Sequence, residues 1–339
     1  MPCCFGHGRC SSVSALRGHL AEHGVVAPKG AIHVKRLADA VADETIGLPE
    51  DVRELQKHFK PAEVDGLVLP IVMMGFLNKM MDAMGFNLEE GVVKAVEDVA
   101  TASGWSAGRH EVVTTGRERH PSKGRPWRLW LGMVPYMPAA VLADSRWTKG
   151  VPSSASRATP WLLERTGYRF PMITAAKQGR IIRTLSTMVR DNLDPEVSEV
   201  GTGTKQLAGV IYTAGLFNDE LVRGTRRMAE KAVPNVSIDL LDRLVELASE
   251  TLDLNDPNVL DDVERNLLAL AGENVAMDES LLAALLLAKA MSPSPAVVPT
   301  ALVERCTERM KPAAIIELVT WFSLLSLLHR YDMFQEASS

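Results

Sequence analysis

The sequence is poor in cysteine: four cysteines in 339 residues are too few for a disulfide framework. It also lacks the run of about 20 apolar residues that a membrane-spanning helix needs. Its longest uncharged apolar run, Leu67–Leu77, has 11 residues, and the run Ile315–Leu328 is interrupted by Glu317. No basic region followed by an apolar stretch opens the chain, so we expect no secretory signal. These absences predict a cytoplasmic protein without a membrane partner.

Positive charge is also in deficit, because 37 Lys and Arg stand against 42 Asp and Glu, a formal net charge of −5. The pI is about 6.0. Nucleic-acid-binding domains are usually basic, so we expect no nucleic-acid partner. Strand-like alternation bounded by turn residues is nearly absent as well, which leaves helices as the main element.

Helical periodicity is present along much of the chain. The segment Pro61–Met84 begins with proline, which suits the first helical turn, and is followed by Gly85, which suits a C-terminal cap. Apolar residues recur at helical spacing in four later segments: Lys177–Arg190, Ile238–Leu252, Val259–Ala271 and Ser280–Met291. We predict an all-α fold.

Residues 104–160 differ in composition from the rest. They hold six prolines and four of the six tryptophans, and a fifth, Trp161, follows directly. A flexible linker is poor in tryptophan, so we expect an ordered strap across a surface. Its first part, GRHEVVTTGRERHPSKGRPWR, is strongly basic. This part is either a solvated connector or a strap that binds an anion or contacts another subunit.

The two halves of the chain resemble each other. KPAEVDGLVLPIVMMGFLNKMMDAM from Lys60 matches KPAAIIELVTWFSLLSLLHRYDMF from Lys311 at a constant offset of 251. LAEHGV from Leu20 similarly matches MAEKAV from Met228. Repeated units predict two related helical modules packed pseudo-symmetrically. We place them at residues 1–103 and 161–339, joined by the strap at 104–160, with extra helices in the second module.

The N-terminal stretch concentrates residue types that can bind metals. His19 and His23 enclose an H-x-x-E-H pattern, which is typical of inverted zinc peptidases. In the repeat, however, His19 lies opposite Arg227 and His23 opposite Lys231, so these positions share basicity and suit the last turn of a helix. The remaining ligand types lack the paired spacing of structural zinc sites: Cys3, Cys4, His7 and Cys10. We predict no metal site and no cofactor.

The segments LAEHGV, FLNKMMDAMGF and KPAAIIELVTWFSLLSLLHR together resemble the carboxymuconolactone decarboxylase and alkylhydroperoxidase D-like family. The resemblance implies an all-helical, usually oligomeric protein with a small apolar pocket between helices. The implied partners are a small organic molecule and further copies of the chain.

The peroxidase branch of this family carries a C-x2-C-x3-H helix preceded by a glutamate. In the first module Cys10 lies near the first cysteine position, and in the second module Asn218 or Phe217 takes that place. No cysteine occurs between Cys10 and Cys306, so the dithiol mechanism is excluded for both modules. The glutamate of the first module would precede Met1. Either the chain begins within a module, or that module borrows a helix from the other module or from a partner.

Polar residues in apolar surroundings are the candidates for a site. Asn78 and Asp82 lie four residues apart on one helix face among methionines, and the repeat places Asn78 opposite His329. We assign catalytic roles to Asp82, Tyr212, Asp219 and Arg223, and ligand binding to Asn78, Asn218, His329 and Cys10. Arg223 could hold a carboxylate, and Asp82 could abstract a proton if burial raises its pKa. Alternatively, Asp219 and Arg223 pair along their helix.

The function that these observations favour is binding or transformation of a small organic molecule by acid–base chemistry of the lyase or isomerase type. One alternative is a non-catalytic scaffold or assembly subunit. Another is a one-cysteine thiol peroxidase that uses Cys10.

Overall fold

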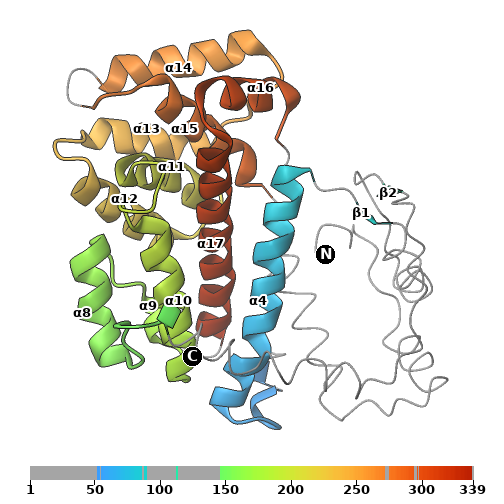
Figure 1. Cartoon of the computed structure of the whole chain (residues 1–339), viewed down its shortest axis with the longest axis vertical. Helices are drawn as coiled ribbons and strands as arrows, with labels where there is room; N and C mark the ends of the chain where they lie inside the picture. Colours follow the sequence, from blue (N-terminus) through green and yellow to red (C-terminus); the bar gives the residue numbers. More distant parts are fainter. Residues whose placement is uncertain are drawn as a thin grey trace.

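The computed structural model describes residues 52–53, 55–85, 88–89, 112–113, 146–271, 275–293, 296 and 298–337. In these residues the regular structure is helical (Figure 1), apart from two-residue strands β1 (Leu88–Glu89) and β2 (Val112–Val113), which pair in parallel. The prediction of an all-α fold is confirmed. The predictions for Cys10, His19 and His23 lie outside the described residues.

Five of the described helices begin and end close to the positions predicted for them. In chain order they are α4 (Pro61–Met84), α8 (Ala155–Thr166), α9 (Pro171–Thr174), α10 (Gly179–Leu193), α11 (Thr202–Ala214), α12 (Asp219–Ala232), α13 (Ile238–Ser249), α14 (Pro257–Ala271), α15 (Glu279–Met291), α16 (Thr300–Arg309) and α17 (Pro312–Ala337). The predicted segments correspond to α4, α10, α13, α14 and α15. The boundary predicted at residue 160 falls inside α8.

Local signals in the sequence explain where α4 starts and stops. Pro61 occupies its first position, where a missing N–H costs no helical hydrogen bond. The Glu63 carboxylate accepts the backbone N–H of Lys60 at 2.7 Å, which satisfies a donor at the N-terminus. Gly85 ends the helix with φ at +63°, a conformation that glycine adopts without strain.

The core is centred on α11 and α17. Residues 205–214 of α11 and residues 321–332 of α17 are all buried. The indole of Trp321 lies against Gly209, where a Cβ would come within 3.2 Å of Nε1, and this Nε1 donates to the carbonyl of Lys205 at 3.0 Å. A side chain at position 209 would require the indole to shift by a few tenths of an ångström, so glycine suits this close approach of the two helices.

A buried ion pair ties the start of α17 to α11. The ammonium of Lys205 donates to the Asn192 carbonyl and the Ser198 hydroxyl, both at 2.7 Å, and lies 3.1 Å from the Glu317 carboxylate. Burial lowers the pKa of Lys205, and Glu317 opposes this shift. All three donors of the ammonium have acceptors, as a buried charge requires.

Helices α4 and α17 run antiparallel and side by side, although more than 200 residues separate them in the chain (Figure 1). Gln335 near the end of α17 donates to Asp65 near the start of α4 at 3.5 Å. Further along, the guanidinium of Arg330 fills the space next to Gly75 that a Cβ would need. These are the two segments that match at the offset of 251.

By length and composition, Pro61–Met84 and Pro312–Glu336 could each cross a bilayer. In α17, 67% of the apolar stretch is buried inside the helical body. The core helix of a folded protein passes the same test, and α17 has that arrangement.

Candidate functional site

A hydrogen-bonded cluster joins the N-terminus of α12 to the last third of α17. Asn218 caps α12, because its Oδ1 accepts the backbone N–H of Leu221 at 2.9 Å. This use of Oδ1 fixes the amide, so that Nδ2 faces α17. There it donates to Asp332 Oδ2 at 2.9 Å and to His329 Nδ1 at 3.2 Å. An amide nitrogen can only donate, so Nδ1 of His329 is the acceptor and the neutral ring carries its proton on Nε2.

The two residues of α17 in this cluster are buried. Asp332 is 7% exposed and His329 is 6% exposed. Burial raises the pKa of Asp332; the hydrogen bond from Asn218 opposes the rise, while the nearby Glu336 and Glu220 add to it. Asp332 therefore holds a proton more strongly than an ordinary aspartate.

A second carboxylate, Glu220, lies on the first turn of α12. The hydroxyl of Tyr168 donates to its Oε1 at 2.9 Å, and Arg223 Nη2 contacts its Oε2 at 2.6 Å. Burial alone raises the pKa of Glu220, but the hydrogen bonds from Arg223 and Tyr168 outweigh it and lower the pKa overall. Glu220 is thus held in its ionised form.

Tyr168 is packed tightly beneath α12. It is 2% exposed, and the centroid of its ring lies 4.7 Å from the centroid of the Phe170 ring. Burial raises the pKa of Tyr168, and the carboxylate of Glu220 raises it further. The phenol is therefore a neutral hydrogen-bond donor. Gly224 makes room for it, because a Cβ there would lie 2.5 Å from the ring.

The cluster opens to solvent along α12. The side chains of Glu220 and Arg223 are 34% and 61% exposed, in contrast to the buried Asp332. Phe217, which precedes Asn218, is 83% exposed and has φ at +55°. A left-handed conformation is costly for a bulky residue and is found preferentially at functional sites.

The predicted site residues fall into separate places. Asn218 and His329 are in contact. Arg223 pairs with Glu220, on the first turn of the helix that Asn218 caps. Asp219 is exposed on the first turn of α12. Among the described residues, Arg223 forms its ion pair with Glu220, three residues before it in α12, and not with Asp219.

Tyr212, Asn78 and Asp82 belong to a different buried region, where α4 meets α11 and α17. Tyr212 stacks on Phe322 with ring centroids 5.1 Å apart, and the ammonium of Lys79 lies 5.8 Å from the Tyr212 centroid. Asn78 and Asp82 are 7% and 8% exposed. Cys10 lies outside the described residues.

Sequence reasoning missed Asp332 and Tyr168 as site residues. Asp332 had a signal, since it follows His329 by three residues in a mostly apolar helix and so shares its face. Tyr168 had none, because it meets Glu220 only through tertiary packing across 52 residues.

Among the described residues, no group of three or more His, Cys, Asp or Glu side chains could hold a metal ion. The thiol described there, Cys306, is buried, and burial raises its pKa to about 12. A thiol with that pKa is a poor nucleophile at neutral pH.

No protein-family model, curated protein or solved structure matches the chain. Function is therefore inferred from the chemistry of the site itself.

Proposed function

We propose that the cluster around Asn218 binds a small organic molecule and transforms it by acid–base chemistry, without dithiol redox. The chain is then a non-redox relative of the carboxymuconolactone decarboxylase and alkylhydroperoxidase D-like family. It acts in the cytoplasm as a homo-oligomer and needs no metal or other cofactor.

The observation that carries this proposal is the opposite displacement of two neighbouring carboxyl groups. The pKa of Asp332 is raised and that of Glu220 is lowered. Environments that separate the pKa values of two carboxyl groups are typical of sites with distinct acid and base roles. Asp332 is the group that exchanges a proton with the substrate, and Glu220 stays ionised.

The remaining residues position these two. Asn218 donates hydrogen bonds to both Asp332 and His329 and so holds them together. Because His329 Nδ1 accepts from Asn218, its Nε2–H is the hydrogen-bond donor of the neutral ring. Tyr168 and Arg223 fix the Glu220 carboxylate from both sides. Cys306 is buried and its pKa is raised, so this thiol takes no part in the proposed chemistry.

The proposal is tested by ligand-observed NMR of the full chain with a library of small hydroxy acids, oxo acids and lactones. Compounds that bind are then followed for conversion by the same spectra. We expect Asp332→Asn to abolish conversion while binding persists, and Asn218→Ala to weaken both.

Asp219→Asn is the matched control, because Asp219 is an exposed carboxylate next to Asn218 in the chain. It should behave as the wild type. Conversion that survives in Asp332→Asn, or a library without any binder, would count against the proposal.

A further inference from the structure

Charge is strongly segregated along the chain. Residues 146–190 contain nine Lys and Arg and a single acidic residue, Glu164, whereas residues 237–310 contain five Lys and Arg and fourteen Asp and Glu. The first range forms α8, α9 and α10, and the second includes α13 to α16. The charge pattern therefore follows the fold.

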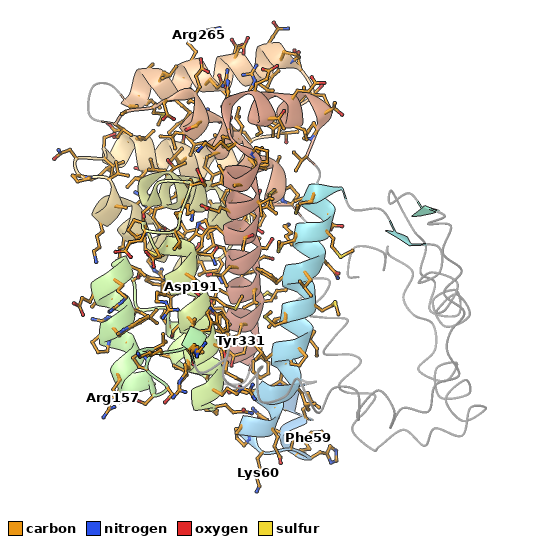
Figure 2. The ribbon with its side chains drawn as sticks, in the orientation of Figure 1. Phe59, Lys60, Arg157, Asp191, Arg265 and Tyr331 are labelled. Atoms are coloured by element: carbon orange, nitrogen blue, oxygen red, sulfur yellow. The ribbon has the colours of Figure 1, made fainter. Side chains whose placement is uncertain are left out.

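The basic range presents its charge where three helices begin. Gly179 at the start of α10 lies against the carbonyl of Ser153, just before α8, and Gln178 donates to the carbonyl of Ala62 in the first turn of α4. In Figure 2, Lys60 and Arg157 both lie at the lower end of the molecule. We name this surface the basic end; its exposed residues are Lys60, Arg157, Lys177, Arg180 and Arg183.

The arginines of the basic end have no counter-charge among the residues that the structure describes. Within the described part of the chain, Arg157, Arg180 and Arg183 form no ion pair. Arg157 and Arg180 also sit in the first turns of α8 and α10, and neither turn has an acidic residue. Cations there face the positive end of the helix dipole, which is unfavourable until an anion approaches.

The opposite end of the molecule is acidic. Figure 1 shows α14 and α16 at the end away from the start of α4. Asp253 and Asp256 precede α14 and accept only nearby backbone N–H groups and the Asn258 amide, while Glu304 and Glu308 are exposed on α16. These four residues define the acidic end, and none of them has an ion pair within the described residues. Leu268 and Val303, on the same two helices, are 46% and 43% exposed.

We propose that the basic end docks on the acidic end of a second copy of this chain. Guanidinium groups bind carboxylates with two parallel hydrogen bonds, and the acidic end supplies carboxylates that form no ion pair with any described residue. The acidic end of the same chain carries exposed carboxylates that complement the exposed arginines of the basic end, so a second copy is the occupant that the charge pattern favours. Two different surfaces meet in this contact, so it propagates into a ring or a filament. The contact does not depend on the proposed activity.

The experiment is sedimentation of the purified full chain at two ionic strengths. At about 0.01 M the Debye length is roughly 30 Å, and at about 1 M it is roughly 3 Å. We expect species heavier than the 37.0 kDa chain at low salt, increasing with protein concentration, and loss of these species at high salt.

Charge-reversal variants identify the two surfaces. The basic-end variant carries Arg157→Glu and Arg180→Glu, and the acidic-end variant carries Glu304→Lys and Glu308→Lys. Each should lose self-association, and an equimolar mixture should regain it, because the two reversed chains are complementary. Glu230→Lys, an exposed reversal on α12, is the control and should associate as the wild type does.

Several results would overturn the proposal: no association of the wild type at low salt, unchanged association of the basic-end variant, or a mixture that stays dissociated. Binding of a fluorescent oligonucleotide or of phosphatidylserine vesicles that depends on Arg157 and Arg180, without self-association, would instead assign the surface to a polyanion.

Discussion

Replacing Gly224 by alanine is the sharpest test of how Tyr168 is held beneath α12. The new Cβ would lie 2.5 Å from two ring atoms of Tyr168 and 2.7 Å from a third. The ring has no room to retreat, because it is 2% exposed, lies against Phe170, and its hydroxyl is bound to Glu220. The substitution therefore forces either the ring or the helix to move.

Three terms, one stabilising and two destabilising, set the magnitude of the effect. Alanine in a helix interior is favoured over glycine by about 0.5–1 kcal/mol. Overpacking a well-filled core costs about 1–3 kcal/mol, and loss of the hydrogen bond to Glu220 adds about 1 kcal/mol. Gly224→Ala should therefore lower the free energy of unfolding by about 1–3.5 kcal/mol, because overpacking and the lost hydrogen bond together exceed the gain in helix propensity.

Urea denaturation followed by circular dichroism measures this change, and a double-mutant cycle isolates its cause. In a Tyr168→Ala background the clash is gone, so Gly224→Ala should stabilise the protein by about 0.5–1 kcal/mol. If Gly224→Ala stabilised the wild type as well, or if the cycle gave no coupling, the packing of Tyr168 against Gly224 would not be as described.

Three further predictions follow from buried charged or titratable groups. Burial raises the pKa of Asp332, so ionisation of its carboxyl reduces folding stability as pH rises above the ordinary pKa value of 3.8. Asp332→Asn should therefore raise the urea midpoint at neutral pH and leave it nearly unchanged at pH values below 3.8. An equal change of the midpoint at both pH values would refute this cause. Lys205→Met removes one partner of a buried ion pair, and such a loss costs about 3–5 kcal/mol of folding stability. Because Glu317 is 25% exposed and keeps two backbone donors, we expect urea denaturation to give a loss at the lower end of this range. Glu317→Gln should cause a smaller loss of stability. Native Cys306 should resist alkylation at pH 8 and react in denaturant, as read by peptide mass spectrometry, because burial raises its pKa to about 12.

Much of the helical architecture could be predicted because it is encoded locally. Pro61 marks the start of α4 because its fixed φ suits the first helical turn. Gly85 marks the end because glycine adopts a left-handed conformation without strain. Spacing of apolar residues located α10, α13, α14 and α15. Short connections and the packing order of these helices depend on tertiary contacts, which periodicity does not specify.

The site was predictable only in part. Asn218 and His329 were selected as polar residues in apolar surroundings, and they lie 3.2 Å apart across 111 residues of chain. Choosing between Asp219 and Glu220 was not possible from sequence, because neighbours on a helix point about 100° apart and the rotation of α12 is set by its packing. That rotation directs Glu220 towards Tyr168 and leaves Asp219 exposed.

The pairing of α4 with α17 has a consequence for the order of events during synthesis. The surface of α4 that buries Val64, Val68 and Val72 is completed by a helix made more than 200 residues later. At bacterial to eukaryotic elongation rates this delay is roughly 10–50 s. During that time α11 also lacks its cover from Trp321, so apolar surfaces of both early and middle segments stay open to other chains. Folding of this protein is thus a late event that awaits its last helix, and truncation of α17 should send nascent chains towards aggregation or chaperones.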